Sequence, residues 1–150
     1  MVTMITATGE YALRAAVYLA QHHPKPQVSA DVAAATQIPP GYLAKILQGM
    51  VKHGLIHSQR GLGGGFTLAR DPYKINVLEV LTAAGAPIQR IERCPLGLST
   101  HTKLCPVHKL VDDGLKAIEE AFAQAILGEL SLSLEKVPGG KKRPIQALIP

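Results

Sequence analysis

The spacing of apolar side chains changes from segment to segment along the chain and predicts a series of short elements. Residues 10–22 have the spacing of an amphipathic helix, and a short second helix follows over residues 30–35, with Ser29 as its cap. The clearest helical period belongs to a third helix that begins at Pro40 or Gly41. Its apolar face consists of Leu43, Ile46, Leu47, Met50 and Val51.

Two short strands are predicted after the third helix. They cover residues 55–60 and 66–70, and a glycine-rich segment joins them as a hairpin. Asn76 and Glu79 then have the spacing of a capping box, which predicts a further helix over residues 77–84. The succession of helix, short helix, polar-faced helix and basic hairpin is that of a winged helix-turn-helix. The sequence therefore predicts a mostly α fold with a small β wing.

A long apolar stripe marks the C-terminal part of the chain. Its members are spaced four, four, three, four and four residues apart: Val107, Val111, Leu115, Ile118, Phe122 and Ile126. This spacing predicts one helix from Pro106 to about Leu127, ~22 residues or roughly 33 Å long. A single small domain lacks the surface to cover so long a stripe, whereas the same helix of a second copy would cover it. We therefore expect a homodimer.

The charge of the chain indicates the sign of the charge on its partner. Lys and Arg total 16 against 11 Asp and Glu, which gives a net charge of +5. Residues 1–70 hold six basic and two acidic residues, whereas residues 71–140 hold seven basic and nine acidic ones. A basic first half joined to a mildly acidic second half favours a polyanion such as DNA as the partner of the first half.

Other features of the composition exclude whole classes of protein. The chain has no run of the about 18 apolar residues that a membrane span needs, and its N-terminus lacks the pattern of a signal peptide. We therefore expect a cytoplasmic protein with no membrane partner. The sequence also lacks Gly-x-Ser-x-Gly and His-Glu-x-x-His motifs, so we expect no enzyme activity.

The polar face of the third helix and the hairpin behind it form the candidate DNA-binding surface. The helix face carries two lysines and no acid, which by itself also fits an ordinary solvated surface. The hairpin favours DNA, because its glycines allow close approach to a phosphate and Arg60 suits a minor groove or a phosphate. A nucleotide-binding loop is disfavoured because a strand, and not a helix, follows the glycines. The predicted DNA-binding residues are Ser29, Gly41, Tyr42, Lys45, Gln48, Lys52, Arg60, Gly63 and Gly64.

A second group of chemically active residues lies in the aperiodic segment before the last helix. Cys94, Cys105 and His108 are there, with His101 between the two cysteines. Thiolates and imidazoles are ligands for zinc or for iron–sulfur clusters. The same spacing also fits two reduced, packed cysteines, or a redox disulfide between them. Spacing alone leaves these three interpretations open.

Three stretches of the sequence resemble one bacterial family of transcription regulators, that of IscR and NsrR. They are residues 10–15, residues 38–43 and residues 54–66, and the last contains an Arg-Gly-x-Gly-Gly-Gly wing. The resemblance implies a homodimeric winged-helix regulator whose long C-terminal helix crosses between subunits. It also implies DNA contacts from the helix that begins near Pro40 and from the wing at Arg60.

The resemblance further implies a set of cluster ligands. Cys94 matches the first cysteine of the cluster-bearing members and Cys105 the last, while His108 and Glu10 match their histidine and acidic ligands. Thr100 stands where those members have a middle cysteine, which speaks against a 4Fe–4S cluster. The implied alternative is a 2Fe–2S cluster on the two cysteines and His108, completed by Glu10 or His101. Ala44 replaces an acidic base-reading residue of the iron–sulfur regulator, so the target sequence does not carry over.

Together these observations divide the chain into four predicted parts. Residues 1–86 form the DNA-binding domain and residues 87–105 a sensor or ligand loop, followed by a dimerisation helix over residues 106–130 and a basic tail over residues 131–150. The predicted function is that of a dimeric repressor of transcription that binds palindromic DNA and senses redox state, nitric oxide or iron through a 2Fe–2S cluster. Two alternatives are a cofactor-free winged-helix module with inert or disulfide-forming cysteines, and an iron–sulfur electron carrier.

Overall fold

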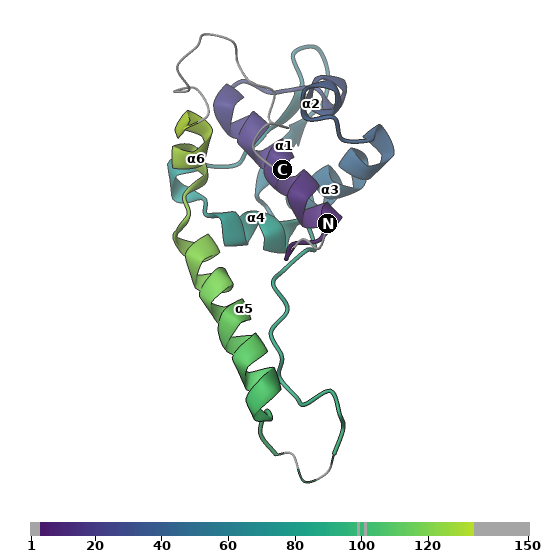
Figure 1. Cartoon of the computed structure of the whole chain (residues 1–150). Helices are drawn as coiled ribbons and strands as arrows, with labels where there is room; N and C mark the ends of the chain where they lie inside the picture. The colour runs from purple at the N-terminus through teal and green to yellow at the C-terminus, as the bar shows by residue number, and fades with distance from the viewer. Residues whose placement is uncertain (1–3, 99, 101, 134–150) are drawn as a thin grey trace.

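The structure is a computed structural model that describes residues 4–98, 100 and 102–133. Figure 1 shows two parts: a body, and a long helix, α5, that projects from it beside an extended loop. The described elements are α1 (Ala7–His22), α2 (Ser29–Thr36), α3 (Pro40–Lys52), β1 (Ile56–Gln59), β2 (Gly65–Leu68), η1 (Pro72–Lys74), α4 (Val77–Ala83), α5 (Pro106–Gln124) and α6 (Leu127–Ser133). The predicted fold class, mostly α with a small β wing, is confirmed.

The first three helices form the helix-turn-helix part of the body. Helix α1 begins at Ala7, earlier than predicted, because the Thr6 hydroxyl accepts a hydrogen bond from the Gly9 N–H at 3.1 Å. The prediction of Ser29 as the cap of α2 is wrong. Ser29 is the first residue of that helix, and the cap is Val28, whose carbonyl accepts hydrogen bonds from the N–H groups of Asp31 and Val32.

The core of the body contains residues of α1, α2, α3, both strands, α4 and α6. Small residues on α1, among them Ala12 and Ala16, are completely buried and allow the neighbouring helices to approach closely. Helix α3 begins at Pro40 as predicted and buries one face. Its buried residues are Leu43, Ile46, Leu47 and Met50.

The predicted hairpin is confirmed as the antiparallel pair β1–β2, with Ile56 opposite Leu68 and Gln59 opposite Gly65. A third segment extends this sheet. Gln27 and Phe66 exchange two backbone hydrogen bonds, N–H to O, at 2.9 and 2.8 Å. The wing is therefore fastened to the segment that leads into α2.

The single C-terminal helix predicted to run to about Leu127 is wrong. Helix α5 ends at Gln124, Ala125 is extended, and α6 begins at Leu127. The break is stabilised by backbone hydrogen bonds from Val77 N–H to the Ala125 carbonyl at 2.9 Å and from Leu127 N–H to the Ile75 carbonyl at 2.8 Å. Leu127 is fully buried in the core, and α6 packs against α1 and η1. Tertiary packing thus overrides the helical period of the sequence at this point.

Helix α5 differs from the helices of the body, because none of its residues is buried. The apolar side chains of its first turns are the most exposed: Val107 is 68% and Leu110 74% exposed. Among the described residues, no helix combines the length and the apolar character that crossing a bilayer requires.

Candidate nucleic-acid interface and metal centre

The outer face of α3 presents the side chains that the sequence singled out for DNA. Gly41, Tyr42, Lys45, Gln48 and Lys52 are all exposed, while the opposite face of the helix is buried in the core. The face therefore contains two lysines and no acidic residue, as predicted. That these side chains contact DNA stays a prediction.

The wing places Arg60 directly after β1, with its side chain exposed. At the tip of the hairpin Leu62 is completely exposed and Gly63 has a φ of +73°, a conformation that favours glycine. Gly64 has a steric role: a Cβ at this position would lie 2.3 Å from the Gln59 carbonyl oxygen. Gly64 is therefore required for the turn itself, whatever it contacts.

Two predicted site residues, Ser29 and Glu10, are less available to a ligand than the exposed residues of α3. Ser29 is half-buried in the first turn of α2. Glu10, on α1, forms an ion pair with Arg14 one turn later. The Arg14 guanidinium also lies 5.6 Å from the centre of the Tyr11 ring, and that ring makes an edge-on contact with Tyr42 of α3 at 5.9 Å. No pattern in the sequence indicates this link between α1 and α3, because contacts between different helices leave no periodic mark.

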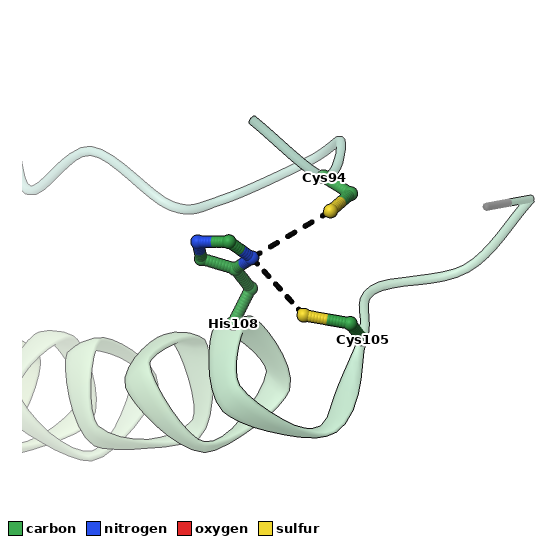
Figure 2. A group of neighbouring side chains, drawn as sticks. All are labelled: Cys94, Cys105 and His108. Carbon is green, nitrogen blue, oxygen red and sulfur yellow. Dashed lines mark hydrogen bonds between the residues drawn. The ribbon is translucent and has the colours of Figure 1, made fainter. Parts of the chain in front are cut away.

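The second candidate site lies at the start of α5, where Cys94, Cys105 and His108 meet (Figure 2). The Nδ1 atom of His108 is 3.1 Å from the Cys105 sulfur and 3.6 Å from the Cys94 sulfur. The three donor atoms all lie within 4.8 Å of one another. The structure thus brings together three of the four predicted metal ligands from residues that are up to 14 positions apart.

The surroundings of Cys105 favour its thiolate. The pKa of the Cys105 thiol is lowered, chiefly by a hydrogen bond from the backbone N–H of His108. The Val107 N–H and the Cys94 side chain lower this pKa further, whereas partial desolvation raises it. Cys105 is the N-cap residue of α5. The first N–H groups of a helix have no helical partners, and they stabilise a negatively charged thiolate at this position. This is a suitable environment for a metal ligand, which must be deprotonated.

An ion pair fastens the loop that carries Cys94 to α5. Arg90 donates two hydrogen bonds to the Asp112 carboxylate, at 2.7 and 2.6 Å, and a third to Glu119 at 3.2 Å. The Ile91 N–H also donates to Asp112, at 2.9 Å. Arg90 and these hydrogen bonds lower the pKa of Asp112 to about 2. No local pattern in the sequence indicates this contact, because its partners are 22 residues apart.

The donor set at this site consists of two thiols and one imidazole, which are ligands for zinc and for iron–sulfur clusters. Glu10 is not in the group that the described residues form, and Cys94 and Cys105 are not joined by a disulfide. His101, the other residue expected to complete a cluster, lies outside the described residues, and Thr100 is exposed. The described residues of the chain therefore supply three candidate ligands.

Comparison with known proteins places this architecture among transcription regulators. Residues 5–133 match the model of the Rrf2 family, described as an iron-dependent transcriptional regulator. IscR of Vibrio cholerae, an HTH-type transcriptional regulator, is 30% identical over 132 residues, which cover 87% of this chain and 76% of IscR. A Mycobacterium tuberculosis protein named as an HTH-type transcriptional regulator is 37% identical over 94 residues. This match covers 58% of that relative's length. The match to an HTH-type transcriptional regulator of Aquifex aeolicus covers 54% of that protein's length.

Solved structures support the same fold. CymR, the global cysteine regulator of B. subtilis, has a TM-score of 0.73 at 22% identity, over 89% of this chain and 98% of CymR. IscR of T. potens has a TM-score of 0.72 at 25% identity, over 90% of this chain and 92% of that protein. The sequence relatives are named as transcriptional regulators, and the solved structures show that this chain shares their fold.

Proposed function

Because this chain belongs to the Rrf2 family of transcription regulators, we propose that it is a homodimeric repressor that binds palindromic double-stranded DNA. The observation that carries the proposal is the exposed, acid-free face of α3 beside the exposed Arg60 of the wing. In a winged helix-turn-helix, a helix in this position enters the major groove. Such a regulator would act in the cytoplasm, where bacterial DNA is found.

The individual contacts follow from the chemistry of the exposed groups. Lys45, Gln48 and Lys52 would face the major groove, with Tyr42 and Gly41 near the phosphate backbone. Arg60 would enter the minor groove or bind a phosphate, and Gly63 would allow the wing to approach closely. Ser29 and Gly64, which are half-buried, would offer backbone contacts to phosphate.

A second copy of the chain would cover the apolar face of α5. Its exposed apolar side chains include Val107, Leu110 and Val111, and the charged side chains Lys109 and Asp113 pair with each other on another face. A helix with this pattern is stable in water when a partner helix covers its apolar stripe. Two-fold symmetry would then place two α3 helices about one turn of DNA apart, on the order of 34–36 Å.

We further propose that the group of Cys94, Cys105 and His108 is the sensor, and that it holds a 2Fe–2S cluster with Glu10 as the fourth ligand. The chemistry of the donor set fits, because thiolates together with histidine are known ligands of such clusters. A cluster at this site would supply a redox-active and nitric-oxide-reactive centre. Within one protomer Glu10 pairs with Arg14, so in this proposal the Glu10 carboxylate of a second copy completes the set.

The DNA-binding proposal is tested by selecting sites from random-sequence DNA with the full-length protein. We expect a palindromic consensus, tight binding by fluorescence anisotropy, and fewer transcripts in vitro from a promoter that overlaps the site. Recovery of sequences without a consensus would contradict the proposal.

A matched pair of charge removals then tests the wing. Arg60→Ala should weaken binding and reduce the slope of log affinity against log salt by about one. Lys116→Ala removes the same charge from α5, where Lys116 pairs with Glu120 at 3.8 Å, and should behave like the parent. Equal salt slopes for the Arg60 variant and the parent would remove the wing from the proposed interface.

The cluster proposal has its own readout. Protein purified without oxygen should be brown, with broad visible absorption and equal amounts of iron and acid-labile sulfide. Cys94→Ser, Cys105→Ser and Glu10→Gln should each remove this absorption. A colourless parent protein after anaerobic reconstitution with iron and sulfide would contradict the cluster, while leaving DNA binding to its separate test.

A further inference from the structure

Leu62, at the tip of the wing, is the most exposed large apolar side chain among the described residues. It is 108% exposed, whereas Leu110, the next in exposure, is 74% exposed. An apolar side chain stabilises a fold in proportion to the area that the fold covers, and here the protomer covers none of it. The burial of Leu62 therefore contributes nothing to the stability of the protomer, and its position has to be explained by what the wing meets.

The backbone of the wing tip, residues 61–64, holds Leu62 at the corner of a tight turn. The Gly64 N–H donates a hydrogen bond to the Gly61 carbonyl at 3.0 Å, and Gly63 has a φ of +73°. A hydrogen bond across four residues with a positive φ at the third, but not at the second, is the pattern of a type II turn. Leu62 is the second residue of this turn, and the glycines around it have no side chains that could shield it.

The wing is a firm support for this tip. Phe66 of β2 exchanges two backbone hydrogen bonds with Gln27, and β1 packs against α3. A side chain on such a support loses little conformational freedom when it enters a partner, so more of its contact energy appears as affinity.

The charges around the wing tip indicate which partner Leu62 meets. Residues 32–70, which include α3 and the wing, contain four Lys or Arg residues and no Asp or Glu. The exposed Arg60 stands two positions before Leu62. Proteins enter the minor groove of DNA with this combination: an arginine is attracted by the negative potential of the groove, and an apolar side chain enters between neighbouring base pairs. An anionic bilayer, by contrast, is bound through a broad apolar helix face and not through one leucine.

We propose that Leu62 is a specificity-determining wedge that enters the minor groove and partly unstacks one base-pair step in each half-site. The proposal rests on the proposed DNA binding and adds to it a preference for deformable DNA. Unstacking costs least at flexible pyrimidine–purine steps such as TA and CA/TG. The protein therefore selects such a step under the wing, although leucine makes no hydrogen bond to a base.

The test uses the full-length protein and the site recovered by selection from random-sequence DNA. 2-Aminopurine, an adenine analogue whose fluorescence rises when it is unstacked, replaces the adenine of each pyrimidine–purine step in turn. We expect the parent protein to raise the fluorescence several-fold at one step of each half-site. Leu62→Ala should abolish this rise and weaken binding about tenfold. It should leave the salt slope unchanged, because an apolar side chain displaces no counterions.

Three further variants sharpen the test. Leu62→Met keeps an apolar side chain of similar size and should retain most of the affinity and the fluorescence rise. Leu62→Lys should lose the rise; tighter binding of this variant with a steeper salt slope and the same rise as the parent would place residue 62 at a phosphate and overturn the wedge. Leu132→Ala removes an exposed leucine from α6 and should bind like the parent.

Several results would contradict the wedge alone. They are equal affinities of the parent and Leu62→Ala, a bound parent that unstacks no step, and an effect of Leu62→Ala on binding to phosphatidylserine–phosphatidylcholine vesicles but not on binding to DNA. A parent protein that binds no DNA would instead contradict the proposed function, and the wedge with it.

Discussion

Helices α3 and α5 have the same kind of apolar stripe, but this chain covers only one of them. Helix α3 buries Leu43, Ile46, Leu47 and Met50 in the core of the body. Helix α5 is longer, 19 residues against 13, and buries none. In Figure 1 it extends beyond the body with only the loop beside it. Similar patterns in the sequence therefore have two different outcomes in this chain: one apolar face lies in the core, and the other stays exposed, which is why we propose that a second copy covers it.

This difference separates the part that one chain completes alone from the part that we propose a second copy completes. The winged-helix body is held by its own core, which includes the buried side of the helix that carries the candidate DNA-binding face. The candidate metal centre lies at the uncovered end of α5, where three ligands meet and the described residues provide no fourth.

Equal truncations on the two helices should have unequal effects on stability. Leu43→Ala removes a completely buried side chain and should lower the free energy of unfolding by about 2–5 kcal/mol. Leu110→Ala removes a side chain that is 74% exposed and should change the stability of the protomer by no more than about 0.5 kcal/mol. Urea unfolding at low protein concentration measures both values. Equal losses would show that α5 packs into the core of its own chain.

A charge in the apolar stripe of α5 should separate the subunits without unfolding them. Val111→Asp places a carboxylate where the partner helix is expected, at a cost of at least about 3 kcal/mol, or roughly 100-fold in Kd. Analytical ultracentrifugation should show a monomer, with the helical circular dichroism of the body retained. Lys116→Ala, on the charged face, is the control and should sediment as a dimer. A dimeric Val111→Asp protein would refute the α5 interface.

Two glycine substitutions compare a crowded position of the wing with an open one on α3. Gly64→Ala would bring a Cβ within 2.3 Å of the Gln59 carbonyl oxygen, so we expect a loss of about 1–3 kcal/mol and weaker DNA binding. Gly41→Ala meets no atom within 4 Å and should leave stability unchanged or slightly higher. Thermal unfolding distinguishes the two variants. A neutral Gly64→Ala would mean that the turn relaxes freely.

The smallest expected effect is the protonation of Asp112 at low pH, which should weaken the attachment of the loop that carries Cys94. The folded pKa of Asp112, about 2, lies below the ordinary value of 3.8, so its contribution to stability is present above that value and is lost as the pH falls through about 2. The Ile91 amide reports this directly, because it donates to Asp112. Its NMR shift should stay constant down to about pH 4 and move below it. Asp112→Asn should abolish the movement; a midpoint near 4 in the parent would show that the ion pair is absent in solution.

Local signals in the sequence were sufficient for much of the body. The capping box of Asn76 and Glu79 is present as predicted, with hydrogen bonds in both directions. The periodicity of α3 identified its buried residues, with the exception of Val51, which is 36% exposed. Such features succeed because hydrogen bonds and apolar contacts between residues three or four positions apart leave a mark on the sequence itself.

Contacts between distant segments leave no local pattern in the sequence and could not be predicted from it. The break at Ala125 depends on hydrogen bonds with the segment before α4, and nothing in the local sequence contradicts a continuous helix there. The Arg90–Asp112 pair and the contact of Tyr11 with Tyr42 are likewise tertiary. For the candidate metal centre, the sequence and the family resemblance named residues that the structure brings together, but only the fold shows that one nitrogen faces both sulfurs.

The attachment of α5 near its C-terminal end has a mechanical consequence. Its 19 residues form an arm of about 28 Å, with the body at one end and Cys105 and His108 at the other. For an arm of this length, a displacement of about 5 Å at the tip corresponds to a rotation of roughly 10° where it joins the body. If the proposed ligand at the far end were to displace the tip, the body would turn through only this small angle. In a dimer, two such turns would add, and the separation of the two α3 helices would change by the sum of both.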